Sequence, residues 1–283
     1  MSRDHVNTDY RNKEFPMTDK DFQRIAELAG RYTGIVLGDH KRDMVYGRIA
    51  RRVRKLNLFS FTHYLDYLEA NTTQELSCFI NVITTNLTSF FRENHHFDYL
   101  EKTVLPELRK KNATAKRLRI WSAGCSSGQE PYSIAMTLLK ASMPSDWDIK
   151  ILATDLDSDV LAKAKQAVYS NADIDGLNDS IIKGSFQQSS NNKEVKVKEK
   201  VSKYIHFKRL NLLENWPMSG PFDVIFCRNV VIYFDKPTQK ILFNRYADML
   251  TIGGYLFIGH SENLNGVSNR FENIGHTIYR KVF

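Results

Sequence analysis

Beyond residue 118 the chain repeats one pattern, in which a short apolar run is followed by a helical one. Strand-like runs fall at 118–123, 149–153, 204–209, 222–227 and 255–259, with helical patterns at 131–141, 158–168 and 238–250. Strands that alternate with helices favour a largely parallel sheet covered on both faces. We therefore expect a doubly wound α/β domain over 118–283, with a last, antiparallel strand at 277–282.

The segment before residue 98 has a wholly helical pattern. Apolar residues recur at helical spacing from residue 19 and across 41–56, 61–69 and 75–85. Residues 1–16 are polar without periodicity, so we expect a loose tail followed by a helical N-terminal domain over 17–97. A basic stretch at 110–117 closes a linker that we expect over 98–117.

One stretch interrupts the alternation of strands and helices. Residues 187–192, Gln-Gln-Ser-Ser-Asn-Asn, have the composition of a loop, and residues 195–198 alternate apolar and charged side chains as a strand does. A small antiparallel β insertion is therefore expected at about 170–203.

Charge and cysteine content indicate the kind of partner and the cellular compartment of this protein. Lys and Arg number 40 against 32 Asp and Glu, a formal charge of +8, which favours an acidic partner such as nucleic acid, anionic lipid or an acidic protein. The 3 cysteines are widely spaced and fit neither a disulfide framework nor a zinc site. No apolar run approaches the ~20 residues of a membrane span, and residues 1–19 lack the apolar core of a signal peptide. We expect reduced thiols and a cytoplasmic location.

The most informative residues form a turn directly after the first predicted strand. Gly124 and Gly128 flank Cys125-Ser126-Ser127, and a helix follows. In open α/β sheets, ligands bind beyond the carboxyl ends of the strands, where glycine lets the backbone approach them closely. Asp155 ends the second predicted strand, a position from which a carboxylate accepts hydrogen bonds from ribose hydroxyls. Together these residues predict a nucleoside-containing cofactor.

The spacing of the two glycines disfavours the commonest nucleotides. Gly-x-x-x-Gly differs from the Gly-x-Gly-x-x-Gly of dinucleotide binders and from the Gly-x-x-x-x-Gly-Lys-Ser/Thr of phosphate-binding loops. A nucleoside without phosphates needs less of a glycine cradle. S-adenosylmethionine fits this description.

The same turn allows a second interpretation. Residues 124–128 also match the Gly-x-Ser-x-Gly of α/β-hydrolases, with Ser126 as nucleophile and Asp223 or Asp235 and then His260 in the required order. Such a turn normally follows several strands, whereas only helices precede this one. The sequence also has no His-Gly-Gly stretch to form an oxyanion hole. The hydrolase is therefore the weaker hypothesis.

Four longer motifs stand out in addition to these patterns. They are Thr84-Thr85-Asn86-Leu87-Thr88-Ser89-Phe90-Phe91-Arg92-Glu93, the turn with Glu130-Pro131-Tyr132-Ser133, Ala153-Thr154-Asp155-Leu156-Asp157, and Phe226-Cys227-Arg228-Asn229-Val230-Val231-Ile232-Tyr233-Phe234-Asp235. In order and spacing, from about residue 20 to the end, the chain resembles the chemotaxis receptor methyltransferase family, CheR. The resemblance implies a Rossmann-like methyltransferase sheet that uses S-adenosylmethionine and releases S-adenosylhomocysteine. It also implies methyl esterification of glutamate side chains on membrane chemoreceptors.

Transferred residue by residue, the resemblance implies a set of cofactor contacts. They fall on Asn86, Thr88, Arg92, Glu130, Asp155, Asn211, Leu212, Arg228 and Asn229, to which the turn adds Gly124. Arg92 and Tyr233 are implied to lie beside the transferred methyl group and are the candidate catalytic residues. The alternatives are a plain surface arginine and a tyrosine that only packs at a strand end. The helical domain would supply residues 86–92.

A basic face on the second predicted helix suggests where the substrate binds. Its cations are Lys41, Arg48, Arg51, Arg52 and Lys55. Such a face is usually only the solvated side of an amphipathic helix. It would also suit the acidic methylation helices of the chemoreceptors that the resemblance implies as partners. In some family members the small β-subdomain also binds a peptide at the receptor's C-terminus by strand addition.

Two further functions are weighed against this one. A nucleic-acid methyltransferase acting on adenine would carry a motif like Asn-Pro-Pro-Phe/Tyr where this chain has Arg228-Asn229-Val230-Val231. A catalytically silent adaptor would bind cofactor and receptor without turnover, and the complete set of matching positions argues against it. We expect no metal site, because His95, His96 and His260 lack a ligand constellation. We also expect no nucleic-acid partner, no membrane insertion, recruitment to receptor arrays at the inner membrane, and a monomer.

Overall fold

The computed structural model describes residues 13–190, 192–264 and 266–283. Most of the expected tail, at 1–12, and residue 191 of the loop expected at 187–192 lie outside the described residues. The chain divides into two compact units between Thr85 and Asn86, earlier than the boundary expected at residue 97. We call them the helical unit and the α/β unit.

Over its described residues, 13–85, the helical unit contains helices and no strands, as predicted. They are α1 (Asp19–Thr33), η2 (Asp39–Lys41), α2 (Arg42–Lys55), α3 (Phe61–Ala70) and α4 (Thr72–Ile83). α1 begins at a capping box, because the Asp21 N–H donates to Thr18 Oγ1 at 3.1 Å while the Thr18 N–H donates to the Asp21 carboxylate at 2.9 Å. It ends at Gly34 in the left-handed conformation, φ 72°.

The core of the helical unit comes from the apolar stripes that the sequence predicts. Ile25 of α1, Ile49 and Val53 of α2 and Tyr64 of α3 are fully buried in one cluster. Phe15 packs against the same cluster. The tail expected over 1–16 is therefore wrong at its end, because this aromatic ring gains more from burial than a polar tail would.

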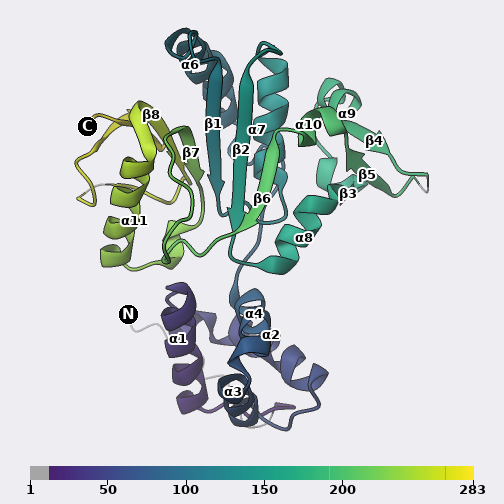
Figure 1. Ribbon diagram of the computed structural model, residues 1–283. Helices are drawn as coiled ribbons and strands as arrows, with labels where there is room; N and C mark the ends of the chain where they lie inside the picture. The colour runs from purple at the N-terminus through teal and green to yellow at the C-terminus, as the bar shows by residue number, and fades with distance from the viewer. Residues whose placement is uncertain (1–12, 191, 265) are drawn as a thin grey trace, which may run out of the picture. The chain divides into compact units, whose positions relative to one another are not determined.

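The α/β unit is built on a seven-stranded, mostly parallel sheet of order β6-β2-β1-β7-β8-β10-β9 (Figure 1). The strands are β1 (Arg117–Ala123), β2 (Asp148–Asp155), β6 (Ile205–Arg209), β7 (Phe222–Cys227), β8 (Leu250–Ile258), β9 (Phe271–Gly275) and β10 (Ile278–Lys281). β6, β2, β1, β7 and β8 are parallel, and β10 is antiparallel to both β8 and β9. The strand order reverses at β1, which has β2 on one side and β7 on the other. The predicted fold class is thereby confirmed.

Alternate residues of the central strands supply two different cores, one on each face of the sheet. Ile120 and Phe226 belong to one buried cluster, whereas their neighbours Trp121 and Cys227 belong to another. The first face is covered by helices α5 (His95–Tyr99), α6 (Leu105–Lys111), α7 (Gln129–Lys140) and α8 (Ser158–Gln166), and the second by α11 (Lys236–Met249).

The linker expected over 98–117 is wrong. Residues from His95 to Lys111 form α5, a π-helical turn η3 (Leu100–Val104) and α6 without a break. Leu100, Val104 and Leu108 are fully buried against the sheet. Their apolar spacing is helical, but the charged residues Glu101, Lys102 and Glu107 stand between them and hide the stripe.

The small β insertion is present as a three-stranded antiparallel sheet of order β3-β5-β4 (Figure 1). Its elements are β3 (Val168–Ser170), η4 (Asn171–Ile174), α9 (Asp179–Ser185), β4 (Phe186–Gln188), β5 (Glu194–Val197) and α10 (Glu199–Ser202). Tyr169 of β3 donates its hydroxyl to the Ser127 carbonyl at 2.7 Å, which ties the insertion to the glycine turn.

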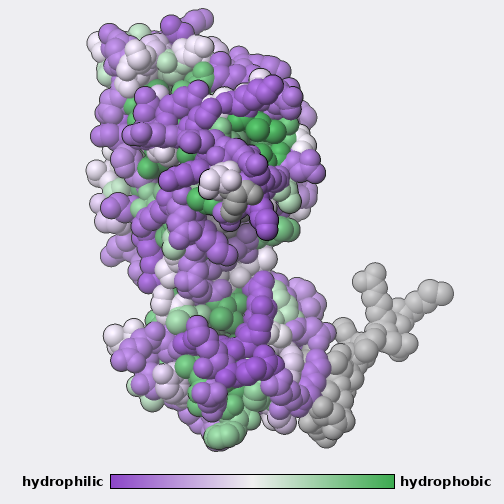
Figure 2. All heavy atoms as spheres, turned by 90° about the vertical axis from the view of Figure 1, so that its right-hand side faces the viewer, coloured by the Kyte–Doolittle hydropathy of each residue, from purple (hydrophilic) through white to green (hydrophobic). Residues whose placement is uncertain are grey.

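The surface on the side of the small sheet is mostly hydrophilic, with only limited hydrophobic areas (Figure 2). Within the part of the chain that the structure describes, each helix is too short or too polar to cross a membrane.

Candidate functional site

The turn after β1 needs both of its glycines. Gly124 has φ 96°, and a Cβ atom there would lie 2.4 Å from Val230 Cγ2. Gly128 has φ 97°, and a Cβ would lie 2.9 Å from both Ala164 Cβ and Tyr169 Oη. Any other residue at either position would force the backbone or its neighbours apart. The turn therefore packs closely on the loop after β7, at the reversal of strand order where open α/β sheets bind ligands.

Asp155 stands at the end of β2, beside this turn. Its carboxylate accepts the Ser126 N–H at 2.8 Å and the Asp157 N–H at 2.9 Å, one on each oxygen. Each oxygen keeps a second lone pair. Burial raises the pKa of the Asp155 carboxyl to about 6 despite these N–H donors. A half-buried carboxylate at this strand end suits the paired hydroxyls of a ribose.

The segment before α5 belongs to the α/β unit, so the expectation that the helical domain supplies residues 86–92 is wrong. Asn86 is tied down twice, because its amide donates to the Asp157 carboxylate at 2.7 Å and its carbonyl accepts the Ser126 hydroxyl at 2.9 Å. Thr88 is half-buried. The Arg92 guanidinium donates to the Leu87 carbonyl at 2.9 Å through Nη1.

Arg92 stands between two residues in a strained backbone conformation. Phe91 has φ 51° and Glu93 has φ 55°, values that are rare for bulky residues. Phe91 is held by its N–H, which donates to Ser133 Oγ at 2.9 Å, and by its ring, which meets that of Phe97 edge-on at 5.2 Å. Such strain persists only where the surroundings enforce it, and it gathers at functional sites.

Arg228, in the loop after β7, is the hub of a buried polar network. Its Nη1 lies 3.3 Å from the Glu130 carboxylate and its Nη2 lies 3.3 Å from the Glu93 carboxylate. Nη2 also donates to the backbone carbonyl of Arg92. Glu130 accepts the Ser122 hydroxyl at 2.7 Å. Arg228 and Glu130 are both buried and bonded within the protein, so they position the loops around them, and their direct contact with a cofactor stays a prediction.

The two carboxylates of this network differ in acidity. Burial raises the pKa of the Glu130 carboxyl. Burial acts in the same direction on Glu93, but the hydrogen bond from His260, at 3.0 Å, and the charge of Arg228 outweigh it and hold the pKa of Glu93 at about 2. Glu93 is therefore ionised at neutral pH.

The remaining predicted residues follow strand ends at the same edge of the sheet. Asn229 has φ 58° and donates its amide to Glu93 at 3.4 Å. Tyr233 ends η5 (Val231–Tyr233) and is half-buried. Asn211 and Leu212 follow β6, the neighbour of β2, and the Leu210 N–H donates to the Asp155 carbonyl at 3.0 Å. Leu212 is buried, whereas Asn211 is half-buried.

The comparisons with known proteins agree with this geometry. Residues 86–280 match the family described as CheR methyltransferase, SAM binding domain, and residues 20–84 match its all-alpha domain. The chain belongs to the CheR methyltransferase family. Its methyl donor is therefore S-adenosylmethionine, and the buried glycine turn and the Asp155 carboxylate fit the nucleoside part of that molecule.

Two relatives illustrate how much of the chain is shared with the CheR family. The chain is 43% identical over 269 residues to the chemotaxis protein methyltransferase of Escherichia coli K12, which covers 93% of this chain and 91% of that protein. It is 41% identical over 271 residues to chemotaxis protein methyltransferase 2 of Pseudomonas aeruginosa PAO1, which covers 95% of both. Among solved structures, a methyltransferase from Mesorhizobium loti is 19% identical with a TM-score of 0.30 and covers 56% of this chain and 54% of that chain.

The hydrolase alternative is wrong. The Ser126 hydroxyl donates to the Asn86 carbonyl, and the His260 imidazole pairs with Glu93. Asp223 lies at the start of β7, the opposite end of the sheet, and Asp235 caps α11. A nucleophile, base and orienting acid are therefore not brought together.

One group of side chains in this CheR-family chain has the spacing of metal ligands. Donor atoms of Glu93, His95 and His96 lie within 4.8 Å of one another, so the expectation that these histidines lack a ligand constellation is wrong in geometry. The guanidinium of Arg228, however, stands 3.3 Å from the Glu93 oxygen that faces His96. A fixed cation already neutralises this carboxylate, which disfavours a second, divalent one.

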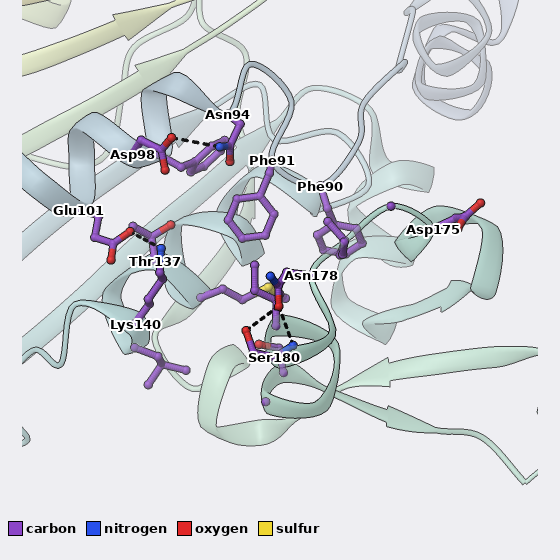
Figure 3. Close-up of a pocket in the computed structure, with 18 of the residues that line it drawn as sticks. Phe90, Phe91, Asn94, Asp98, Glu101, Thr137, Lys140, Asp175, Asn178 and Ser180 are labelled. Atoms are coloured by element: carbon purple, nitrogen blue, oxygen red, sulfur yellow. Dashed lines mark hydrogen bonds and ion pairs between the residues drawn. The ribbon is translucent and has the colours of Figure 1, made fainter.

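A separate cavity of about 730 Å³ lies in the α/β unit between α5, α7 and α9 (Figure 3). The rings of Phe90 and Phe91 face it, and the Glu101–Lys140 ion pair, 2.7 Å long, lies at its side. None of the predicted cofactor contacts lines this cavity. The cavity is therefore separate from the predicted cofactor contacts.

The basic face predicted on α2 is only partly available to a partner. Arg52 forms a bidentate ion pair with the buried Glu75, one bond of which measures 2.6 Å. Arg48 donates to the carbonyls of Ile83 and Thr84 at 3.0 and 2.6 Å and so satisfies the C-terminus of α4. Arg51 and Lys55 are exposed to solvent.

The fifth member of that face, Lys41, is half-buried in η2. Burial lowers the pKa of its ammonium group, and Nζ contacts the Val36 carbonyl at 3.4 Å. Arg48 and Arg52 therefore stabilise the helical unit. The sequence alone did not distinguish these two arginines from the exposed cations Arg51 and Lys55.

Proposed function

We propose that this protein transfers the methyl group of S-adenosylmethionine to glutamate side chains of membrane chemoreceptors and forms glutamate methyl esters. The match to both domains of the CheR family carries the proposal. The relatives named chemotaxis protein methyltransferases support it, and so does a site that contains no assembled nucleophile and base. The protein would act in the cytoplasm, at receptor arrays of the inner membrane.

Methyl transfer requires the protein mainly to position the glutamate carboxylate against the methyl group. When bound, S-adenosylmethionine supplies an electrophilic methyl group on a sulfonium sulfur. The accepting glutamate is ionised at pH 7 and needs no general base. The site must hold that carboxylate in line and exclude water, which can account for most of the rate gain.

Arg92 has the donors to hold the incoming carboxylate. Only its Nη1 is bonded among the described residues, to the Leu87 carbonyl, so N–H groups on Nη2 and Nε stay available for a carboxylate. Because Phe91 and Glu93 fix the backbone on both sides, the guanidinium needs little reorganisation when substrate arrives. Tyr233 would place its ring or hydroxyl beside the methyl group.

The substrate would dock on the helical unit through the exposed cations of α2. Arg51 and Lys55 are the predicted substrate contacts that the structure leaves in solvent. Glutamate-bearing receptor helices carry the complementary charge. Lys41, Arg48 and Arg52 contribute to the positive field of this face even though their side chains are engaged within the unit.

The test is a methyl-transfer assay with receptor-containing membranes and radiolabelled S-adenosylmethionine. Label on the receptor that mild base releases as methanol would support the proposal, and stable label or none would contradict it. The variant Arg92→Ala should lose most of the rate, with Arg31→Ala, an exposed arginine at the end of α1, as the matched control. An unchanged rate in Arg92→Ala would remove this residue from the mechanism.

A second contact with the receptor is proposed at the β insertion. β3 and β4 are the edges of its sheet, and each has three residues, enough for a short peptide to add as a further strand. Methylation of receptors with and without their C-terminal peptide tests this point. Equal kcat/KM for both receptors would contradict peptide tethering and leave the catalytic proposal untouched.

A further inference from the structure

Glu262, in the turn after β8, has an unusual environment for a carboxylate. Its side chain is buried, 5% exposed, and among the described residues no Lys, Arg or His pairs with it. Instead it accepts four backbone N–H groups. One oxygen accepts those of Gly259 at 2.5 Å and Asn229 at 3.0 Å, and the other accepts those of Val230 at 2.9 Å and Ile232 at 3.2 Å.

A carboxylate is a costly way to fill a buried position. Burial raises the pKa of Glu262, and the four N–H donors only partly offset this cost. An apolar residue of similar volume is often at least as stabilising as a buried charge. What a carboxylate provides, and an apolar side chain does not, is a fixed acceptor for several N–H groups at once.

Three of these N–H groups belong to one loop, whose carbonyl groups have other partners, such as the Gln239 amide, which donates to the Val231 carbonyl at 2.9 Å. Asn229 has φ 58°, a left-handed conformation, and its N–H group and side chain lie so close to Gly259 that a Cβ atom there would be 2.4 Å from Asn229 Nδ2. Without Glu262 the N–H groups of Asn229, Val230 and Ile232 would have no acceptor among the described residues. The turn itself is closed by the Glu262 N–H, which donates to the Gly259 carbonyl at 2.9 Å.

The loop that Glu262 holds carries predicted site residues. Asn229 is a predicted cofactor contact, Val230 fits over Gly124 of the glycine turn, and Tyr233 is a candidate catalytic residue one position beyond Ile232. We propose that Glu262 is a positioning residue for methyl transfer, whose carboxylate fixes the backbone of 229–232 and thereby the approach of Asn229 and Tyr233 to cofactor and substrate. This inference rests on the proposed function.

The informative variant is Glu262→Gln, which keeps the size of the side chain. One oxygen becomes an NH₂ group that faces two N–H donors, so that half of the clamp is lost and its contacts become repulsive. Displacements near 1 Å around a reacting centre cost about 100-fold in rate. We expect kcat to fall about 100-fold and the affinity for S-adenosylmethionine to fall about tenfold.

The matched control is Asp223→Asn. Asp223 is also a buried carboxylate of the α/β unit, 3% exposed, and accepts the Arg119 N–H at 2.8 Å and the Asn112 amide at 2.9 Å. It lies at the opposite end of β7 from the loop. This variant should lower Tm as Glu262→Gln does, yet leave kcat and cofactor affinity within about twofold of wild type.

Two readouts keep the inference separate from the proposed function, because they need no receptor. Cofactor affinity is measured by calorimetry, and amide hydrogen exchange is measured at Asn229, Val230 and Ile232. In Glu262→Gln exchange at these amides should rise more than tenfold, with β1 unchanged. The positioning role would be overturned if Glu262→Gln bound S-adenosylmethionine as tightly as wild type, or if its amide exchange were unchanged. It would also be overturned if both variants lost activity in proportion to their loss of Tm. If wild-type protein failed to methylate glutamate, only the proposed function would fall.

Discussion

The guanidinium of Arg228 donates a hydrogen bond to the backbone carbonyl oxygen of Arg92. The same side chain lies 3.3 Å from Glu130 at the start of α7 and 3.3 Å from Glu93. One buried cation thus joins three loops that meet at the reversal of strand order.

Removal of Arg228 should therefore cost stability as well as function. Arg228→Ala leaves the Glu93 and Glu130 carboxylates buried without their cation, and breaking a buried pair in this way costs about 3–5 kcal/mol. We expect urea unfolding of the α/β unit to show a loss of that size, together with weaker binding of S-adenosylmethionine. Arg209→Ala, at the exposed end of β6, is the control and should lose less than about 1 kcal/mol. If both variants lost the same free energy of unfolding, the Arg228 network would contribute nothing to stability.

The affinity for S-adenosylmethionine should depend on pH through Asp155. Ribose hydroxyls donate to the ionised carboxylate, so protonation of Asp155 competes with binding. With a pKa of about 6, binding at pH 5 should be about tenfold weaker than at pH 7. Calorimetry at both pH values tests this. Asp155→Asn should bind weakly at both and lose the pH dependence, whereas Asp159→Asn, exposed on α8, should behave as wild type.

The contribution of His96 to the stability of the α/β unit should fall as pH decreases from about 6.5 to about 4, whereas the raised pKa of Asp155 acts in the opposite direction. Burial and the nearby charge of Arg228 lower the pKa of His96 to about 4. Below pH 6.5 the unfolded chain therefore binds a proton that the folded chain does not, at a cost of about 2–3 kcal/mol over the whole window.

His96→Gln should remove this slope, and urea unfolding at pH 7, 5.5 and 4.5 measures it. His63→Gln, in the helical unit, is the control. The assignment to His96 fails if the wild type and His96→Gln lose the same stability between pH 7 and 4.5.

Charge reversal on α2 should separate docking from folding. Arg51→Glu with Lys55→Glu should lower kcat/KM for receptor at least tenfold at low salt, with Tm and cofactor affinity unchanged, because both side chains are exposed. Arg52→Ala should instead destabilise the helical unit by about 3 kcal/mol or more, because Glu75 would lose its partner. If the charge-reversed variant kept the wild-type kcat/KM for receptor, this face would not be the docking surface.

Local signals explain why much of the fold was predictable from the sequence. The helix from residue 19, the apolar strands and the glycine turn each depend on residues close together in the chain, and each lies where it was predicted. The α5–α6 helix was missed because its apolar stripe is interleaved with Glu and Lys. Strand β9 was missed because its side chains show no clear alternation and it pairs with β10 alone.

The sequence predicted which residue types form the site, but not which role each of them has in the structure. Arg51 and Arg52 are neighbours with the same side chain, and only the tertiary contact of Arg52 with Glu75 on α4 gives them different roles. Glu262 gave no signal, because three of its four N–H partners, Asn229, Val230 and Ile232, lie about thirty positions earlier in the chain. Hydrogen bonds from a side chain to backbone groups far away in the chain leave no trace in the sequence pattern.

The central strand β1 pairs with β7 through Ile120 and Val224, residues that are far apart in the sequence, while the helical unit is held together by neighbouring helices. Contacts between distant residues carry a loop-closure entropy that must be overcome before the sheet can gain from pairing. We therefore expect two refolding phases, a fast one for the helical unit and a slower one for the sheet. The loops of the α/β unit that carry the predicted cofactor contacts would therefore form only in the slower phase.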